Sequence, residues 1–265
     1  MKAYAIRDGE GDFPVGVLLY FEKEKSFVVE LREELDEWTA PLLFSACVRR
    51  KIYTIPRDIS FLWVKERIIP SGRQNIKTIL KNHGLKEYDE LKFLELSEGR
   101  CSQDSLYIRK IQTLPDYVIE RRKHNVTECT PCGEGELLCF FADGKIKKTD
   151  LSLLRDNDDI DKILRNKALF ESAKVAAGGY CITFNDSIDI PASVLYSQGL
   201  EIPLRQSDFI SFVRKNVLDT AQASQLLGCS RQNLAYMVSK EQLCTLREDV
   251  KGNLYLKGEV LKDKW

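Results

Sequence analysis

One stretch of the chain most constrains the fold, because it holds two capped helices on either side of a glycine. Thr220 is a residue type that caps helix N-termini, and the apolar residues after it recur at helical spacing. Gly228 is expected to end this helix, since glycine adopts the left-handed conformation without steric cost. Ser230 is expected to begin a second helix by accepting a hydrogen bond from the backbone N–H two or three residues later. Two helices joined by a tight glycine turn form a helix-turn-helix.

Side chains of the second predicted helix divide into an inward and an outward set. Leu234, Met237 and Val238 recur at helical spacing and are expected to face the protein interior. Arginine, glutamine and asparagine pair with the edges of guanine and adenine, so the outward set suits base recognition in the major groove. We predict DNA contacts by Ser230, by Arg231, Gln232 and Asn233 to bases, and by Tyr236 and Lys240 to sugar and phosphate.

A short apolar hairpin is predicted after the second helix. Residues 243–246 and 254–256 flank the sequence Lys251-Gly252-Asn253, which is typical of a turn with a basic and polar tip. Such a hairpin is expected to lie as a wing along the phosphate backbone, with Lys251 and Asn253 as its contact residues.

The segment from Thr220 to Leu256 resembles the winged helix-turn-helix of the excisionase and MerR-like class. There, a pattern such as Ala-x-x-Leu-Gly-x-Ser-Arg-x-x-Leu precedes a two-stranded wing, and this chain is similar around Gly228 and Ser230. The resemblance implies a DNA-binding fold. The chain departs from the class at Glu241-Gln242, where glycine and lysine are usual, so its path after the second helix is left open. A helix pair that serves protein contacts alone is the alternative.

The remaining sequence predicts an α+β fold in several domains. Residues 15–21 and 26–31 are rich in strand-forming residues, whereas 73–83 and 87–96 have apolar residues at helical spacing. Strands followed by helices, instead of alternating with them, indicate α+β. The predicted boundaries are 1–115 for an N-terminal α+β domain, 116–135 for a linker, 136–200 for a small α+β domain, and 205–265 for the winged helix-turn-helix domain.

Two further resemblances concern the first two domains. Val15-Gly16-Val17-Leu18, Arg73-Gln74-Asn75-Ile76 and Gly99-Arg100-Cys101 are similar to the N-terminal subdomain of HipA-type kinase toxins, over about the first 110 residues. That subdomain is not the kinase core, and the chain has no phosphate-binding glycine-rich loop or His-Arg-Asp motif.

The second domain contains a predicted hairpin, 137–141 and 145–149, around Ala142-Asp143-Gly144. Together with Gly178-Gly179 and Leu195-Tyr196-x-x-Gly199, it resembles a family of small bacterial domains of unknown function. Members of that family often lie beside helix-turn-helix segments or in toxin-antitoxin settings, and the resemblance brings no catalytic set.

Charge is balanced over the whole chain, with 40 Lys and Arg against 40 Asp and Glu, so it does not itself argue for nucleic acid. Residues 205–265 contain ten Lys and Arg against seven Asp and Glu, which predicts a modest phosphate contribution. The charged run 120–124 is interpreted as a solvated face. No apolar stretch approaches the roughly 20 residues that span a bilayer, and a cytoplasmic location is expected.

Candidate chemistry is sparse. Of eight cysteines, Cys129-x-x-Cys132 alone has ligand spacing, and zinc would need Cys101 or Cys139 to complete the site. We therefore predict no metal and no cofactor. The two histidines, His83 and His124, lack partners at a known catalytic spacing, so we do not expect an enzyme.

Two functions remain as hypotheses. The first is a sequence-specific transcriptional regulator that binds double-stranded DNA as a homodimer, because operators are commonly palindromic. The alternative is a protein-binding inhibitor, such as an antitoxin, that contacts its partner through residues 1–200 and uses the helix-turn-helix for autoregulation. The size of the region outside the DNA-binding segment motivates this second hypothesis.

Overall fold

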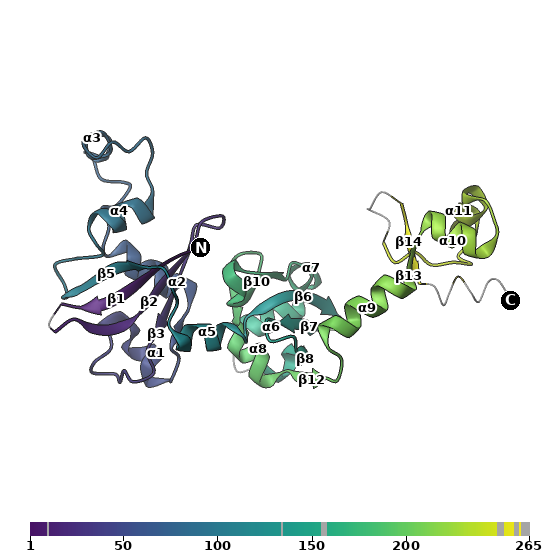
Figure 1. Ribbon diagram of the computed structural model, residues 1–265, viewed down its shortest axis with the longest axis horizontal. Helices are drawn as coiled ribbons and strands as arrows, with labels where there is room; N and C mark the ends of the chain where they lie inside the picture. Colours follow the sequence, from purple (N-terminus) through teal and green to yellow (C-terminus); the bar gives the residue numbers. More distant parts are fainter. Residues whose placement is uncertain (10, 134, 155–157, 248–251, 257–259, 261–265) are drawn as a thin grey trace. The chain divides into compact units, whose positions relative to one another are not determined.

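The computed structural model describes all residues except 10, 134, 155–157, 248–251, 257–259 and 261–265 (Figure 1). The described residues form helices and antiparallel strand pairs, which confirms the predicted α+β class. Contacts divide the chain into two compact units, here called unit 1 (Met1–Asp143 and Thr149–Gly199) and unit 2 (Gly144–Lys148 and Leu200–Trp265). In the part of the chain that the structure describes, no helix is long and apolar enough to cross a membrane.

A five-stranded antiparallel sheet forms the N-terminal part of unit 1, in the order β4-β3-β2-β1-β5. Its strands are β1 (Lys2–Asp8), β2 (Phe13–Phe21), β3 (Ser26–Leu31), β4 (Thr54–Ile55) and β5 (Leu106–Ile111). The central strand β2 is buried on both faces, because alternate residues point to opposite sides and each side carries a hydrophobic cluster. Leu18 and Tyr20 belong to one cluster, and Val17 and Leu19 to the other. The strands predicted at 15–21 and 26–31 are confirmed.

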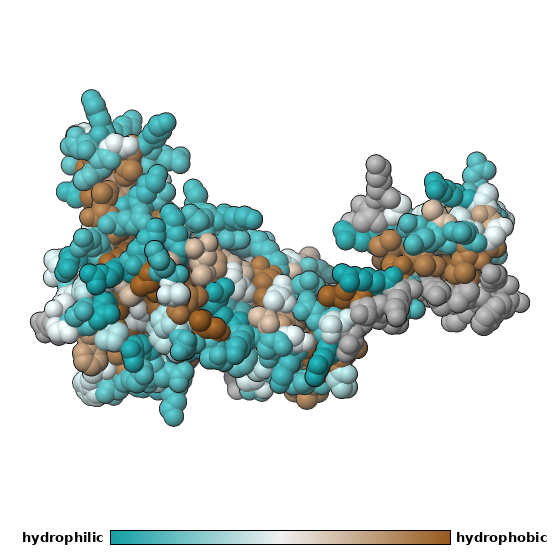
Figure 2. All heavy atoms as spheres, viewed as in Figure 1, coloured by the Kyte–Doolittle hydropathy of each residue, from teal (hydrophilic) through white to brown (hydrophobic). Residues whose placement is uncertain are grey.

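Helices pack against the first face of this sheet. They are η1 (Leu42–Phe44), α1 (Ser45–Arg49), α2 (Arg57–Lys65) and α4 (Glu90–Leu96), whereas α3 (Ile76–Asn82) contributes no residue to the cluster on that face. Trp63 and Val64 of α2 and Leu94 of α4 are buried in the cluster, and the Ser60 hydroxyl accepts a hydrogen bond from the backbone N–H of Val29 at 3.0 Å. The helices predicted at 73–83 and 87–96 correspond to α3 and α4. No residue of α3 is buried, and Figure 2 shows apolar side chains at the surface near α3 and α4.

The second face of the sheet packs against later parts of unit 1. Val118 of α5 (Asp116–Arg122) and Tyr180 are buried against Val17 and Val28 of the sheet. Gly179, at the end of η3 (Ala177–Gly179), has φ +76°, and a Cβ there would lie 2.1 Å from the carbonyl oxygen of Val126. Only glycine fits this close approach without displacing backbone. Residues 116–135, for which we predicted a linker, thus include a helix that contributes to the core.

A buried ion pair lies at the edge of this second cluster. Glu30 is fully buried, and its Oε2 accepts hydrogen bonds from Nη1 of Arg121 at 2.8 Å and from the Thr54 hydroxyl at 2.9 Å. Arg121 also donates to the carbonyl oxygen of Leu31 at 2.7 Å. Burial raises the pKa of the Glu30 carboxyl, although the Arg121 guanidinium opposes that shift. The interpretation of the run 120–124 as a solvated face is therefore wrong for Arg121, which is mostly buried.

The rest of unit 1 has a hydrophobic core of its own, formed by residues such as Leu137, Phe141, Ile163 and Phe184. Strand β6 (Val126–Cys132) pairs antiparallel with β7 (Glu136–Phe141). A separate three-stranded sheet has the order β11-β10-β9, and its strands are β9 (Lys174–Val175), β10 (Cys181–Phe184) and β11 (Ile188–Pro191). The accompanying helices are η2 (Leu151–Leu154), α6 (Asp158–Arg165), α7 (Lys167–Glu171) and α8 (Ala192–Gln198).

Unit 2 contains the predicted helix pair. In chain order its elements are the first residues of β8 (Ile146–Asp150), then β12 (Leu200–Ile202), α9 (Gln206–Asn216), β13 (Val217–Asp219), α10 (Thr220–Leu227), α11 (Arg231–Ser239) and β14 (Leu254–Leu256). β12 pairs antiparallel with β8, and β13 with β14. The core of the second half of unit 2 is made by Ala223, Leu234, Leu243, Tyr255 and Val260. This small core holds α10 and α11 against β14.

Candidate nucleic-acid interface

The first helix of the pair, α10, has its N-cap one residue earlier than predicted. Asp219, not Thr220, is the N-cap: its carboxylate accepts a hydrogen bond from the backbone N–H of Gln222 at 2.8 Å, and the Gln222 side chain accepts one from the N–H of Asp219 at 3.1 Å. This reciprocal pair is a capping box. The prediction of Thr220 as the cap is wrong, because its hydroxyl bonds to the backbone of Asn253 instead.

The turn between the helices has the predicted geometry. Gly228 is left-handed, with φ 67° and ψ 28°, and it ends α10. The N–H of Cys229 donates to the carbonyl of Ser224 at 3.0 Å and that of Gly228 to Gln225 at 3.2 Å, the two bonds of a Schellman motif. Ser230 then caps α11 by accepting from the N–H of Asn233 at 3.1 Å.

The predicted contact residues of α11 lie on its solvent side. Leu234 is fully buried, whereas Met237 and Val238 are half-buried and pack against the same core. The residues that we predicted to contact DNA are all exposed: Ser230, Arg231, Gln232, Asn233, Tyr236 and Lys240. Ala235 and Ser239 are exposed as well. The helix therefore has the expected division between an inward and an outward face.

The outward residues are not equivalent around the helix axis. At about 100° per residue, Gln232 and Tyr236 both lie roughly 160° from Leu234, so they are central on the solvent face. Lys240 follows Tyr236 by four residues, and its ammonium nitrogen lies 5.7 Å from the centre of the Tyr236 ring. Arg231 lies only about 60° from Leu234, at the flank of the helix. The prediction had placed Arg231 and Gln232 together in one outward set.

Two cationic side chains, Arg231 and Lys240, are exposed on α11. Arg231 and Lys240 form no ion pair with any acidic side chain among the residues that the structure describes.

The strand arrangement next to the helices differs from the predicted hairpin. The predicted strand 254–256 is confirmed as β14, but its ladder partner is β13, with Leu218 opposite Tyr255. The other predicted strand, 243–246, is wrong in its bounds, because the bridge that the described residues form on that side joins Arg247 and Leu254. Sequence reasoning missed β13, whose signal was the apolar pair Val217-Leu218 before a capping aspartate.

The structure describes one of the two wing residues that we predicted. Lys251 lies outside the described residues. Asn253 is half-buried, and its backbone N–H donates to the Thr220 hydroxyl at 3.2 Å. The start of β14 is thereby fastened to the first turn of α10.

The chain leaves α11 at Glu241, where the sequence departs from the excisionase and MerR-like pattern. Glu241 is left-handed, with φ 57°. Its N–H donates to the carbonyl of Val238, and the N–H of Gln242 donates to Met237, both at 3.0 Å. This is a second Schellman motif, built on a glutamate where glycine is favoured. The chain thus leaves α11 through a left-handed residue, a conformation that an L-residue adopts at a steric cost.

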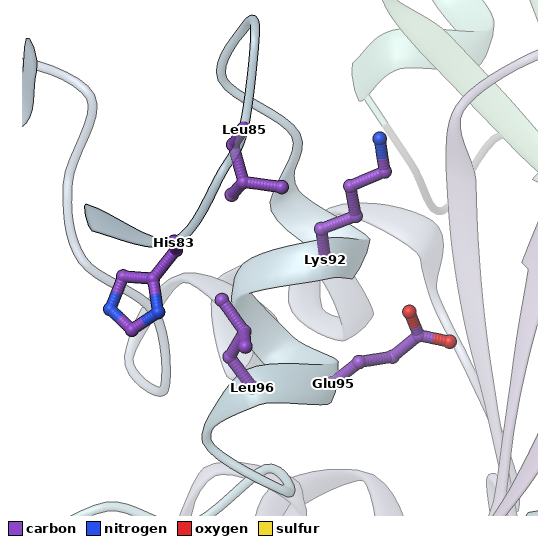
Figure 3. Close-up of a pocket in the computed structure, with 5 residues that line it drawn as sticks. All are labelled: His83, Leu85, Lys92, Glu95 and Leu96. Carbon is purple, nitrogen blue, oxygen red and sulfur yellow. The ribbon is translucent and has the colours of Figure 1, made fainter. Parts of the chain in front are cut away.

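Unit 1 also has a small open pocket of 240 Å³, lined by His83, Leu85, Lys92, Glu95 and Leu96 (Figure 3). His83 ends α3, whereas Lys92 and Glu95 extend from α4 on the other side of Leu96. The ionisable groups point away from one another, so the pocket does not assemble them around one point. Within the described part of the chain, no group of three or more His, Cys, Asp or Glu residues is placed to hold a metal ion.

Comparisons with known proteins complete the description of the site. No family model, no curated protein and no solved structure matches this chain.

Proposed function

We propose that this chain is a sequence-specific DNA-binding transcriptional regulator, whose unit 2 is a winged helix-turn-helix that places α11 in the major groove. The observation that carries the proposal is the division of α11: Leu234 is buried in the core, while Gln232, Tyr236 and Lys240 form an exposed stripe on the opposite side. A capped helix with glutamine, asparagine and arginine in its first turn presents the residue types that recognise bases.

The dimensions of the helix suit this role. An α-helix with its side chains is about 10–12 Å in diameter, which fits a major groove about 12 Å wide, and the nine residues of α11 make about 14 Å of helix to lie in it. Gln232 and Asn233 lie at the N-terminal end that helix-turn-helix proteins direct toward base edges. Tyr236 and Lys240, one and two turns later, are then in position for sugar and phosphate. We further propose that two copies act together on a palindromic site.

A second candidate function is a protein-binding inhibitor, and one observation in unit 1 favours it. Trp38 and Leu42 are 86% and 92% exposed. The turn that carries Trp38 is ordered, because the Asp36 carboxylate accepts hydrogen bonds from the N–H groups of Trp38 at 2.9 Å and Thr39 at 2.8 Å. An ordered, exposed tryptophan is typical of a protein contact. In this alternative the helix pair serves autoregulation.

The first hypothesis is tested by selecting bound fragments from genomic DNA with the purified protein at two salt concentrations. Two glutamines form a matched pair of variants: Gln232→Ala on α11 and Gln225→Ala on the exposed side of α10. Loss of one good base contact costs about 1–3 kcal/mol, so Gln232→Ala is expected to weaken binding to the selected site about 5- to 150-fold. Gln225→Ala is expected to bind as the unaltered protein does.

Uniform weak binding that disappears with salt, or equal behaviour of the two glutamine variants, would contradict the first hypothesis. The alternative predicts a stoichiometric protein partner that remains bound after residues 205–265 are deleted and is lost from the Trp38→Ala variant.

A further inference from the structure

Two cysteines of unit 1 face each other across neighbouring strands. Cys129 of β6 and Cys139 of β7 are directly opposite in the antiparallel register. Their sulfur atoms are 3.8 Å apart, and the Cys139 thiol donates to the sulfur of Cys129. Residues directly opposite in an antiparallel pair have Cα atoms about 4.5–5.5 Å apart, which is within the range of about 4.4–6.8 Å that a disulfide needs. A bond between these sulfurs therefore requires side-chain rotation and little backbone movement.

The two thiols differ in their access to solvent. Cys139 is fully buried between Leu137 and Phe141 on the core side of β7, whereas Cys129 is half-buried. The hydrogen bond to Cys129 and burial both raise the pKa of the Cys139 thiol, so it remains protonated at neutral pH. A small molecule from solvent would reach Cys129 first. The buried thiol is in place to attack whatever forms on Cys129.

The cysteine pair that stands out in the sequence is not the pair that meets in space. Cys132 lies three residues after Cys129 on β6, so the alternation of side chains places it on the other face of the strand. It is opposite Glu136 in the register, and its thiol donates to the carbonyl of Thr130 at 3.3 Å. Cys132 is thus a neighbouring thiol with a different partner in the register, which makes it a matched control.

We propose that Cys129 and Cys139 form a redox-responsive site that a low-molecular-weight disulfide, such as oxidised glutathione, converts to an intrachain disulfide. In the first step the Cys129 thiolate attacks one sulfur of the small disulfide, and one small thiol leaves with a proton from solvent. In the second step the Cys139 thiol first loses its proton to solvent, its thiolate attacks the Cys129 sulfur, and the second small thiol leaves and takes up a proton. Two protein thiols are oxidised, and one small disulfide is reduced to two thiols.

The test uses the full chain, fully reduced and then incubated with oxidised and reduced glutathione at a series of ratios. Remaining thiols are blocked by alkylation before digestion and mass spectrometry. Trypsin leaves all three cysteines in one peptide, residues 124–145, so a glutamate-specific protease is added to cleave after Glu136. A bond from Cys139 to β6 then joins two fragments, whereas a bond between Cys129 and Cys132 stays within one.

The expected result is a joined pair of fragments in the unaltered protein and in Cys132→Ser, with complete loss of the joined pair in Cys129→Ser. Cys129 is half-buried against the core, and serine keeps an atom that accepts the hydrogen bond from the Cys139 thiol. The proposal is overturned if the joined pair persists in Cys129→Ser, if the disulfide forms between Cys129 and Cys132, or if glutathione remains attached to Cys129. It is also overturned if all three thiols are still alkylated at the most oxidising ratio. None of these outcomes depends on DNA binding.

Discussion

The hydroxyl of Thr220 engages both backbone groups of Asn253: it accepts from the N–H at 3.2 Å and donates to the carbonyl oxygen at 3.4 Å. Thr220 is in the first turn of α10, and Asn253 directly precedes β14. One side chain therefore joins the start of the helix pair to the start of the strand that follows it. The N-cap of α10 is Asp219.

Removal of this hydroxyl is expected to loosen β14. Thr220→Val keeps the shape of the side chain and loses both hydrogen bonds, which is expected to cost about 1–2 kcal/mol. Hydrogen exchange at the amides of Asn253 and Tyr255 is expected to accelerate about 5- to 30-fold, because a cost of that size shifts a local opening equilibrium by such a factor. Thr220→Ser retains the hydroxyl and is the control. Equal exchange in both variants would show that the two bonds do not hold the strand.

A substitution at Gly228, in the turn between α10 and α11, is expected to lower stability through backbone strain alone. No atom lies within 4 Å of a Cβ built on Gly228, so alanine fits there without a clash, but its φ of 67° is unfavourable for any L-residue. Gly228→Ala is expected to destabilise unit 2 by about 1–2 kcal/mol. Urea unfolding followed by a probe in unit 2 measures this. Ser224 and Gln225 keep their backbone bonds in the variant, so a cost far above this range would mean that the Schellman motif has broken.

At the residue that follows α11, a substitution is expected to raise the stability of unit 2 instead of lowering it. Glu241 has φ 57°, and glycine there removes steric strain of about 1–2 kcal/mol while adding about 0.4–1 kcal/mol of unfolded-state entropy. Glu241→Gly is therefore expected to stabilise unit 2 by about 0.5–1 kcal/mol. Glu241→Ala removes the same charge without relieving the backbone and is expected to give no such gain. If both variants are equally stabilised, the charge of Glu241 is responsible, not its conformation.

The buried carboxyl of Glu30 predicts a pH dependence in unit 1. Its folded-state pKa is raised, so its contribution to stability is fully present below the unfolded-state pKa and is lost as pH rises through the folded-state value. Glu30→Gln cannot ionise, and it keeps an amide at the position of the carboxyl. Relative to the unaltered protein, this variant is expected to gain stability from about pH 4 upward. Urea unfolding of both proteins at a series of pH values measures the free energy of unfolding of each. If the free energy of the variant minus that of the unaltered protein falls as pH rises, the prediction is wrong.

The geometry of α11 predicts two distinct effects on DNA binding, if the proposed function holds. Gln232 is central on the exposed face, so Gln232→Ala is expected to relax the preference for one base pair of the selected site. Lys240 is two turns further along, and Lys240→Ala is expected to weaken binding to all sequences alike and to reduce the salt slope by about one. Binding curves on the selected site and on single-base variants of it, at several salt concentrations, distinguish these effects. A change in base preference in Lys240→Ala would contradict the assignment.

Local features of the fold were predictable from sequence, and features that join distant segments were not. Gly228 and Ser230 act on their own neighbours within the chain, so residue type and position were sufficient to place the turn and the second helix. The partner of β14 lies some 37 residues earlier, and the short segment Val217–Asp219 has no strand pattern long enough to identify it. Thr220 was mistaken for the cap because its true partner, Asn253, is also distant.

The same distinction applies to unit 1. Arg121 lies in a run of charged residues that looks solvated, and its buried partner Glu30 is 91 positions away. The spacing of Cys129 and Cys132 drew attention to the wrong pair, since the contact with Cys139 follows from strand register. Nothing in a linear spacing shows which residue of the next strand lies opposite.

The pairing of β13 with β14 has a consequence for the order of events during synthesis. The two helices lie between these strands, and their stop and start signals are local, so each helix is able to nucleate as soon as its residues leave the ribosome. The core that holds them includes Tyr255, and the strand ladder needs Leu254–Leu256. A nascent chain that ends between α11 and β14 therefore carries the two helices without Tyr255 and without the β13–β14 ladder. The core around α10 and α11 is completed only after β14 has emerged.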